Sequence, residues 1–301
     1  MRPLSIIILA SRTGWHTDRL VRALAQRGHT ASLLPYEGLV GRLGRQPGMS
    51  NGASELDHAD AILARIIPAG SLEQIIYRVD ALHRLEDRGV LILNTPGAIE
   101  RSVDKFYTSA LLEQAGLATP ETVVCERAED AFAAFRTMGD VIVKPLFGSM
   151  GLGMVRVSDE EIAFRVFRAV EMVRGIFYLQ RFIEHDGADI RAFVVGDRVV
   201  GAIERRAPGW RTNISRGGEA RVLTLPAEWE RMALTAARAV GADYAGVDLL
   251  PAKDGTVYLL EVNGIPGWEG LERATGIDVA GTIADHLLAR YTGRNAPAAL
   301  P

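Results

Sequence analysis

The sequence predicts a mixed fold of α/β and α+β units, in which a parallel sheet near the N-terminus precedes antiparallel strands near the C-terminus. The first observation is a β-α-β order. Residues 5–10, SIIILA, have the apolar run of a buried strand, residues 16–27 have helical spacing, and residues 30–37 return as a strand. Such an order is typical of a parallel sheet. The second observation is a pair of turn dipeptides, Gly196-Asp197 and Asp254-Gly255, each flanked by apolar runs, which indicates two β-hairpins.

Composition places the chain among ordinary globular proteins. Its 301 residues are enough for two or three modules, and 48% of them are hydrophobic and 24% charged. The net charge of −3 gives no reason to expect nucleic acid or a membrane as a partner. The single cysteine, Cys125, excludes an intrachain disulfide, and the six histidines lack zinc-ligand spacing. The apolar runs are far shorter than the ~20 residues that span a bilayer, and we expect a cytoplasmic protein.

The N-terminal module is expected to end near residue 95. Residues 41–54 are rich in Gly, Ser and Pro and are interpreted as a mobile loop. Residues 60–66 and 90–94 are interpreted as strands, with a long helix over residues 71–88 between them. The loop after the first strand, SRTGWHT, lacks the GxGxxG pattern, so it does not predict a dinucleotide site.

Two of the three lysines lie where a compact positive charge is useful. The other basic residues are arginines, and the planar Arg fork does not replace an ammonium at a phosphate site. After a predicted turn at residues 94–97, Lys105 lies in the first turn of an amphipathic helix over residues 104–115. A solvated surface lysine is the alternative interpretation. Lys253, next to a hairpin turn, is expected to be solvated.

Residues 141–157, VIVKPLFGSMGLGMVRV, predict a strand, a glycine-rich loop and a second strand. Lys144 ends the first strand, and Gly148, Gly151 and Gly153 follow it. The segment is not a Walker A loop, which opens a helix. A flap of this kind lets backbone N–H groups approach phosphates closely, and Lys144 adds a point charge. A plain glycine-rich hairpin is the alternative.

The first hairpin presents charged residues on both of its faces. Alternation places Asp189, Arg191 and Arg206 on one face and Arg205 on the other, unless a bulge shifts the register. A polar loop after the hairpin has Asn213 and Arg216 available to anions. The other elements expected in this half of the chain are helices over residues 159–174, 226–242 and 278–292, and a strand over residues 176–185.

The second hairpin brings polar side chains together. If Asp254-Gly255 is a two-residue turn, Asp248 faces Glu261 and Gly246 faces Asn263, so that the three polar side chains share one face. The opposite face then belongs to the core and consists of Val247, Leu249, Tyr258, Leu260 and Val262.

A cation is expected between these acids, because carboxylates directly opposite one another repel. Two carboxylates and one amide oxygen, from Asp248, Glu261 and Asn263, form a hard oxygen site suited to Mg²⁺ or Mn²⁺. An edge hairpin whose acids point to solvent is the alternative.

Taken in chain order, these motifs resemble the ATP-grasp superfamily and, within it, the RimK-like glutamate ligases. The residues that carry the resemblance are Asp104-Lys105 on a helix, VIVKPLFGSMGLG, QRFI, DIR followed by VVG, RTN followed by GG, GVD, and LEVNGIPG. The resemblance covers roughly residues 4–290. It implies an ATP-grasp fold with an N-terminal α/β (pre-ATP-grasp) module over residues 1–95, a central lid over 96–178, a C-terminal antiparallel-sheet domain over 179–291 and a flexible tail over 292–301.

The resemblance also implies roles for individual residues. Arg191, Arg206 and Lys144 would be catalytic, and the metal would be held by Asp248, Glu261 and Asn263. The nucleotide would be bound by two lysines, the flap, a hinge beside adenine, an acid and a polar segment, namely Lys105, Lys144, Gly148, Ser149, Met150, Gly151, Gln180, Arg181, Phe182, Ile183, Asp189, Arg211, Thr212 and Asn213. Arg181 departs from the Glu usual in the family, but the hinge contact is largely through the backbone.

The activity implied is ATP-dependent carboxylate–amine ligation through an acyl phosphate. L-glutamate or another amino acid would be the amine. The acceptor carboxylate would belong to a ribosomal-protein C-terminus, to a cofactor such as tetrahydromethanopterin, or to a small acid. The expected cofactors are Mg²⁺ or Mn²⁺, with two ions, and ATP as co-substrate. A homo-oligomer is expected.

Two other functions stay open at this stage. A ligase of carrier-protein-linked amino-acid biosynthesis would keep the same site and have a basic groove for an acidic carrier. A nucleotide-binding regulator without ligase activity would have a damaged metal triad or lack the lysines, whereas both are intact in this sequence.

Overall fold

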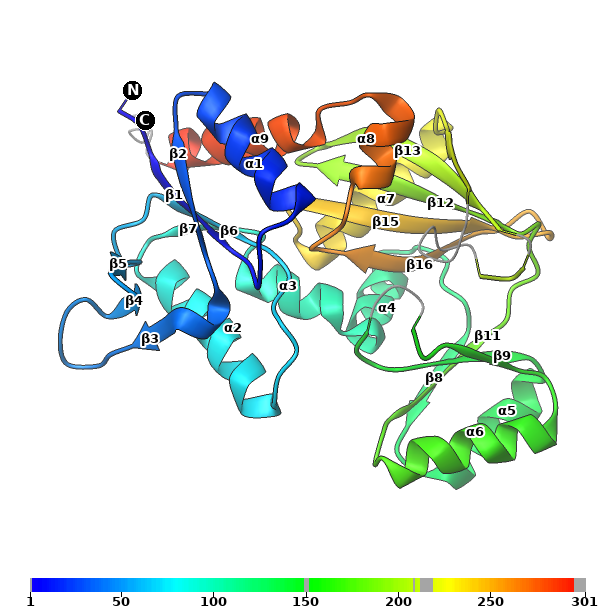
Figure 1. The fold of residues 1–301 in the computed structure, drawn as a ribbon. Helices are drawn as coiled ribbons and strands as arrows, with labels where there is room; N and C mark the ends of the chain where they lie inside the picture. Colours follow the sequence, from blue (N-terminus) through cyan, green and yellow to red (C-terminus); the bar gives the residue numbers. More distant parts are fainter. Residues whose placement is uncertain (1, 149–151, 208, 212–218, 295–301) are drawn as a thin grey trace, which may run out of the picture.

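The N-terminal module is built on a four-stranded parallel sheet in the order β2-β1-β6-β7 (Figure 1). The computed structural model describes residues 2–148, 152–207, 209–211 and 219–294. Ile6 and Ile8 face one hydrophobic core, and Ile7 and Leu9 face another, as expected for a strand covered on both sides. The predicted parallel sheet is confirmed. Its elements are β1 (Ser5–Leu9), α1 (Trp15–Gln26), β2 (Thr30–Leu34), β6 (Ala61–Ala64), α2 (Leu72–Asp87) and β7 (Leu91–Leu93).

Part of the segment predicted as a mobile loop, residues 41–54, belongs to a small antiparallel sheet, and residues 42–48 form the loop between two of its strands. The sheet follows a short 3-10 turn at Tyr36–Gly38 and contains β3 (Leu39–Gly41), β4 (Met49–Asn51) and β5 (Ser54–Glu55). The buried carboxylate of Asp57 accepts hydrogen bonds from the backbone N–H groups of Gly48 and Met49 and pairs with Arg88. Polar contacts of this kind leave no apolar periodicity in the sequence, so the strands within the segment were not predicted.

Two consecutive helices lead from the N-terminal module toward the site. The predicted turn at residues 94–97 was wrong, because Thr95 caps a helix that starts at Pro96, a residue suited to the first helical position. Asp104 ends that helix and caps the next one by accepting a hydrogen bond from the backbone N–H of Tyr107. The helices are α3 (Pro96–Val103) and α4 (Lys105–Gln114), and Lys105 lies in the first turn of α4, as predicted.

The central lid is a four-stranded sheet in the order β10-β9-β11-β8, with two helices packed together on it (Figure 1). Phe135, Phe167 and Phe177 join the helices to the sheet. β9 and β10 pair in an antiparallel manner on either side of the glycine-rich loop, which confirms the predicted strand–loop–strand order. The elements are β8 (Thr122–Cys125), α5 (Ala128–Met138), β9 (Val141–Lys144), β10 (Val155–Val157), α6 (Glu160–Met172) and β11 (Phe177–Arg181).

The C-terminal unit is a five-stranded antiparallel sheet in the order β14-β13-β12-β15-β16. α7 packs on one face of this sheet through small residues such as Ala233 and Ala237. The elements are β12 (Ala188–Val195), β13 (Arg198–Arg206), β14 (Glu219–Val222), α7 (Ala227–Val240), β15 (Tyr244–Pro251), β16 (Val257–Asn263), α8 (Glu269–Thr275) and α9 (Val279–Arg294).

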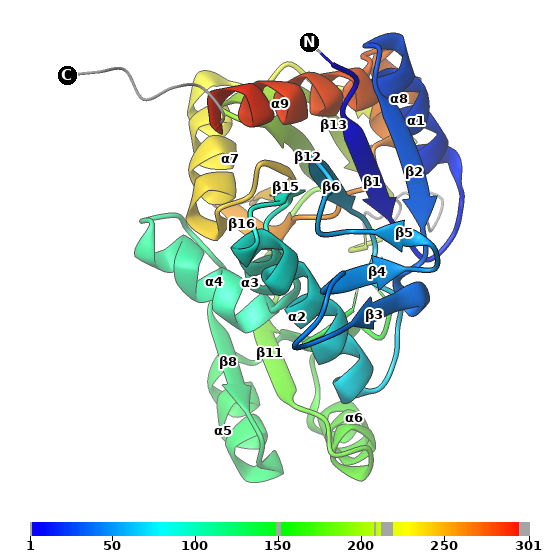
Figure 2. The same cartoon turned by 90° about the vertical axis from the view of Figure 1, so that its left-hand side faces the viewer.

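The last helix returns to the first module, and Figure 2 shows α9 lying across the top of the molecule. Its residues Ile283 and Leu287 share one core with Ile8 of β1 and Phe193 of β12. α9 continues to Arg294, so the helix extends past residue 292, where the tail was predicted to begin. Among the described residues, none of the helices is both long and apolar enough to cross a membrane.

One buried asparagine joins the N-terminal module to the C-terminal sheet. The Asn94 amide nitrogen donates to the carbonyl oxygens of Tyr244 (2.8 Å) and Gly264, and its Oδ1 accepts from the N–H groups of Asp243 (2.7 Å) and Tyr244 (3.0 Å). Asn94 is fully buried. It therefore fixes both the start of β15 and the segment just after β16, the two strands that carry the predicted metal ligands.

Candidate active site

The hairpin of β15 and β16 places Asp248 opposite Glu261 and Gly246 opposite Asn263, as predicted. The route to this register differs from the prediction. Near the turn, Pro251 pairs with Val257, so the loop is longer than two residues, and a bulge beside Asp248 restores the register farther along the strands. The two deviations cancel at the site.

The same bulge changes which side chains of β16 face the core. Leu259 is buried in the core, Leu260 lines the pocket, and Tyr258 is partly exposed. The prediction that Tyr258 and Leu260 belong to the core was therefore wrong. The bulge adds one residue to β16, so the side chains of β16 on the turn side of the bulge point to the face opposite to the predicted one. Val247, Leu249 and Val262 are in the core, as predicted.

A bulge in the hairpin of β12 and β13 exchanges the roles of two arginines. The register shifts between Phe193 and Val194, so Asp189 pairs with Arg205. The Arg206 side chain instead pairs with Glu204 and is 45% exposed. The prediction that Arg206 shares a face with Asp189 and Arg191 was wrong, so this face does not support the catalytic role predicted for Arg206. Arg205 takes that place.

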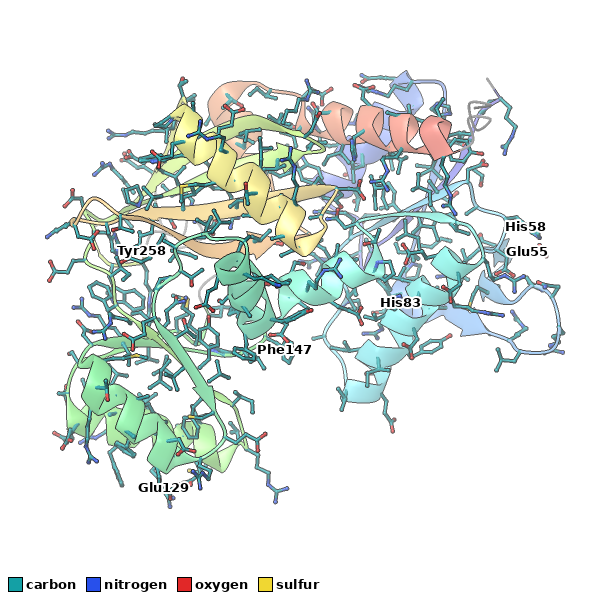
Figure 3. The ribbon with its side chains drawn as sticks, turned by 180° about the vertical axis from the view of Figure 1, so that it is seen from behind. Glu55, His58, His83, Glu129, Phe147 and Tyr258 are labelled. Carbon is teal, nitrogen blue, oxygen red and sulfur yellow. The ribbon has the colours of Figure 1, made fainter. Side chains whose placement is uncertain are left out.

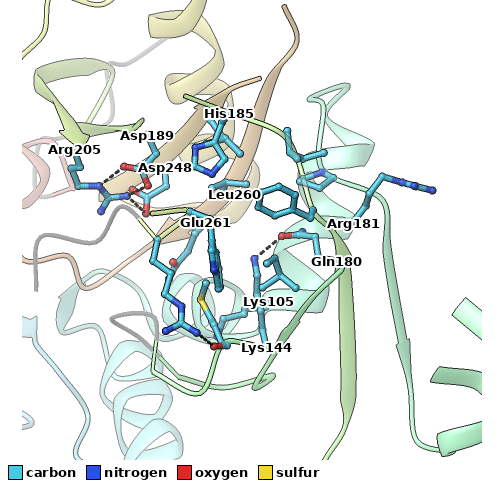
Figure 4. Close-up of a pocket in the computed structure, with 18 residues that line it drawn as sticks. Lys105, Lys144, Gln180, Arg181, His185, Asp189, Arg205, Asp248, Leu260 and Glu261 are labelled. Atoms are coloured by element: carbon cyan, nitrogen blue, oxygen red, sulfur yellow. Dashed lines mark hydrogen bonds and ion pairs between the residues drawn. The ribbon is translucent and has the colours of Figure 1, made fainter. Parts of the chain in front are cut away.

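Two guanidinium groups and two carboxylates form a chain of ion pairs at the site. Arg205, Asp189 and Asp248 are buried, and Figure 4 shows the ion pairs among these three. Arg191 donates to both oxygens of Asp248, at 2.7 Å each. Arg205 donates to both oxygens of Asp189, from Nε at 2.7 Å and from Nη2 at 2.5 Å, and the same Nη2 lies 3.0 Å from Asp248 Oδ2. These bidentate pairs fix both acids in position.

The two facing carboxylates respond differently to this environment. Burial alone would raise the pKa of Asp248, but the adjacent Arg191 and Arg205 outweigh burial and hold that pKa below its ordinary value. Burial and the neighbouring Asp248 charge raise the pKa of Glu261. In the described part of the chain, Glu261 has no ion-pair partner of its own. Glu261 is thus the acid of the pair that still lacks a direct positive charge.

The two predicted lysines converge on this pocket from the lid and from α4. Lys144 Nζ donates to Gln180 Oε1 at 2.5 Å, and Lys105 Nζ donates to the carbonyl oxygens of Leu146 (3.1 Å) and Gly148 (2.9 Å) in the flap. Burial lowers the pKa of Lys144 to about 8, although the Glu261 charge opposes that shift. Burial also lowers the pKa of Lys105.

A single pocket collects most of the described residues that were predicted to bind a nucleotide (Figure 4). These residues are Lys105, Lys144, Gln180, Arg181, Phe182, Ile183, Asp189 and Arg211, and the predicted metal ligands Asp248 and Glu261 also line the pocket. Arg211 closes one side by donating to the carbonyl oxygen of Met154. Ser149, Met150, Gly151, Thr212 and Asn213, together with Arg216, lie outside the described residues.

The pocket also contains residues that sequence reasoning did not find. Arg205, His185, Trp210, Met154 and Leu260 line it. Arg205 and Leu260 were assigned to the wrong faces because hairpin bulges are not visible in a pattern of alternation. His185 and Trp210 follow strand ends, and no motif in the sequence marks them.

The donor set of the predicted metal site fits a hard divalent cation. Asp248 and Glu261 are directly opposed, and the strand pairing brings Asn263 alongside them. Asn263 Oδ1 accepts a hydrogen bond from Ile265 N at 2.9 Å, which holds that side chain in place. Among the described residues there is no group of three or more His, Cys, Asp or Glu side chains that would hold a metal ion, and the third ligand here would be an amide.

Comparison with solved structures defines the class of protein. The ATP-grasp ligase PsnB complexed with minimal precursor superposes with a TM-score of 0.76 at 21% identity, covering 95% of this chain and 99% of that one. A RimK domain ATP-grasp protein from Sphaerobacter thermophilus gives a TM-score of 0.72 at 24% identity, covering 94% and 99%. These likenesses show that the fold is the ATP-grasp fold, with an N-terminal module, a lid and a C-terminal antiparallel sheet.

Sequence comparison then places the chain within that class. Residues 4–99 match the RimK pre-ATP-grasp domain, and residues 102–287 match the RimK-like ATP-grasp domain. The chain belongs to the RimK-like ATP-grasp family. Tetrahydromethanopterin:alpha-L-glutamate ligases from Methanosarcina acetivorans and Methanococcus maripaludis are 35% and 33% identical to it, each with 93% of this chain and 97% of the relative covered. A probable alpha-L-glutamate ligase from Trichodesmium erythraeum is 34% identical, with 91% and 92% covered.

The buried ion pairs predict unequal effects of removing two adjacent arginines. Arg205→Met leaves two buried carboxylates with fewer partners and should lower the free energy of unfolding by about 3–5 kcal/mol. Arg206→Met removes an exposed pair and should change it by less than about 0.5 kcal/mol. Urea unfolding followed by circular dichroism measures both, and equal losses in the two variants would contradict the buried network.

Proposed function

We propose that the protein is an ATP-dependent ligase that joins L-glutamate to an acceptor carboxylate through an acyl phosphate. The observation that carries this proposal is the convergence of opposite charges in one pocket. Asp248 and Glu261 face each other on the hairpin, and Lys105 and Lys144 approach from the other side. Relatives that cover more than nine-tenths of the chain are named alpha-L-glutamate ligases, which supports glutamate as the amine.

The pocket divides into an adenine end and a phosphate end. We assign the hinge, residues 180–183, to the adenine, because all four of its residues line the pocket. We assign Lys105 and Lys144 to the phosphates, because both half-buried ammonium groups line the pocket. Each now bonds neutral oxygen atoms, and the negative charge of a nucleotide would be a stronger partner for both.

Asp248, Glu261 and Asn263 would hold the Mg²⁺ or Mn²⁺, and the presence of two ions stays part of this proposal. When bound, the cation supplies positive charge that stabilises the transferring phosphoryl group. Arg205 keeps the Asp248 carboxylate oriented, and Asn94 fixes the ends of both strands. The chain thus provides positioning and electrostatic stabilisation, and an enzyme nucleophile is not required.

The reaction would proceed in two balanced steps. An oxygen of the acceptor carboxylate attacks the γ-phosphorus of ATP, and ADP leaves. The amino nitrogen of glutamate then attacks the carbonyl carbon of the acyl phosphate, loses a proton and expels phosphate, which leaves an amide. Closure of the flap over the pocket would exclude water that otherwise hydrolyses the acyl phosphate. Arg191, at the edge of the carboxylate pair, is placed to bind the acceptor carboxylate.

The acceptor, assembly and location are further parts of the proposal. A reduced pterin is the first acceptor to test, because two relatives are named for tetrahydromethanopterin. A protein C-terminus and a carrier-bound acid are the other classes to include in the test. Because ATP is the proposed co-substrate, we place the activity in the cytoplasm. A homo-oligomeric state and the three domain boundaries also stay predictions.

Product analysis tests the ligase proposal. The purified protein is incubated with Mg²⁺, ATP, glutamate and a panel of acceptors, and products are weighed by mass spectrometry. We expect one acceptor class to gain a glutamyl unit with stoichiometric ADP.

Glu261→Ala should reduce this turnover by at least about a hundredfold, the loss typical of one stabilising group. Glu129→Ala, at the far end of the lid, is the matched control (Figure 3). Tight ATP binding without any product would instead favour a regulator.

The lowered pKa of Lys144 predicts a pH-dependent nucleotide affinity. Only the protonated lysine attracts phosphate, and burial brings its pKa to about 8. ADP binding, measured by calorimetry from pH 6.5 to 9.5, should therefore be strongest at low pH and weaken above about pH 8. Lys144→Arg stays protonated and should bind with little dependence on pH. A wild-type affinity that is constant from pH 7 to 9.5 would show that Lys144 does not contact the phosphates.

A further inference from the structure

The Asp248 carboxylate is already neutralised in the structure by a group that competes with a metal ion. Both of its oxygens accept hydrogen bonds from Arg191, at 2.7 Å each, and one of them also lies 3.0 Å from Arg205. The Asp248 side chain is 6% exposed. A cation that uses this carboxylate as a ligand must therefore share or replace one of the two guanidinium groups.

The two arginines differ in how firmly they are held. Arg205 makes a second bidentate pair with Asp189, and its side chain is 4% exposed. Arg191 is 20% exposed, and Asp248 is its acidic partner in the described part of the chain. The flank of Arg191 lies beside Gly246, where a Cβ atom would come within 3.6 Å of its Cδ and Nε atoms. Arg191 is thus the more exposed of the two guanidinium groups and the one with fewer acidic partners in the described part of the chain.

We propose that Arg191 and the divalent cation exchange at Asp248, so that Arg191 becomes free to bind the acceptor carboxylate when the cation binds. The destination of Arg191 rests on the proposed function, because a ligase acceptor presents a carboxylate there. The exchange itself rests on the ion pairs alone. Arg191 can then bind the acceptor carboxylate only when the cation has taken its place at Asp248.

Charge arithmetic supports the exchange. In the metal-free protein, Arg191 offsets part of the repulsion between Asp248 and Glu261, which face each other across the hairpin. A divalent cation between these carboxylates supplies that compensation and repels the nearby guanidinium. A carboxylate on the acceptor offers Arg191 an equivalent planar partner. Because coupling is reciprocal, the cation and the carboxylate should each strengthen the binding of the other.

Titration with Mn²⁺ alone, without nucleotide or acceptor, tests the exchange by electron paramagnetic resonance of the free ion. Arg191→Met should bind Mn²⁺ about tenfold more tightly than the wild type, within the usual range for coupled sites. Arg191→Lys keeps the charge but cannot form two parallel hydrogen bonds, so it should also bind more tightly. Arg206→Met is the matched control, because its partner is Glu204, and it should bind as the wild type does.

The Lys variant separates exchange from a simple effect of charge. If Arg191→Lys binds Mn²⁺ with wild-type affinity, or more weakly, the proposal is overturned, even if Arg191→Met binds more tightly. Circular dichroism confirms that each variant is folded, and the Lys variant decides the question if the Met variant is not. Failure of the ligase proposal is separate, because this titration involves neither turnover nor product.

Acetate then tests where Arg191 goes. Acetate should tighten Mn²⁺ binding in the wild type, because the released Arg191 gains a carboxylate partner. The same concentration should have a smaller effect in Arg191→Met, which lacks the guanidinium. An equal effect in both proteins would show that acetate binds the metal directly, and the acceptor-binding half of the proposal would fail.

Discussion

Arg205 is the side chain on which the geometry of the site depends. Its guanidinium pairs with two buried acids, Asp189 on β12 and Asp248 on β15, and so links the two strands. A buried carboxylate without such a partner is costly, so the strands that carry these acids cannot move independently without exposing an unpaired charge. Glu261 is then placed by strand pairing with Asp248, and the uncompensated negative charge that remains faces the two lysines. Under the proposed function, this arrangement would place the cation and the nucleotide phosphates between Glu261 and the two lysines.

The N-terminal module contributes to this site without supplying the predicted metal ligands. Asn94 follows β7 and satisfies four backbone groups at the start of β15 and beyond the end of β16. Arg65, at the end of β6, donates to the carbonyl oxygen of Pro266 at 2.9 Å and stacks over Trp268. The carboxyl edge of the parallel sheet, where ligands of such sheets usually bind, thus packs against the segment that follows Asn263. An acceptor bound between the two units would contact groups from both.

Much of the fold and about half of the site could be predicted from the sequence. Strong apolar periodicity identified β1, α1 and the two C-terminal hairpins, and the pairing of Asp248 with Glu261 followed from turn chemistry. The wrong faces at the site have one physical cause, because a bulge adds a residue without leaving a pattern in the sequence. The bulge in the first hairpin exchanged the predicted faces of Arg205 and Arg206, and the bulge in the second exchanged those of Leu259 and Leu260. In the second hairpin the turn is also longer than predicted, and this compensates for the bulge at Asp248 and Glu261. The small sheet at residues 39–55 was missed because polar contacts of Asp57, rather than alternation, hold it together.

The central claim is that the pocket activates a carboxylate as an acyl phosphate, and oxygen transfer tests that claim most directly. An acceptor whose carboxylate carries ¹⁸O is converted to product with unlabelled ATP, glutamate and Mg²⁺, and the released phosphate is analysed by mass spectrometry. The account predicts one ¹⁸O atom in each phosphate, because the carboxylate oxygen that attacks phosphorus stays with it when the amine displaces it. Phosphate without label, formed together with the amide product, would show that the carboxylate is never phosphorylated and would contradict the account.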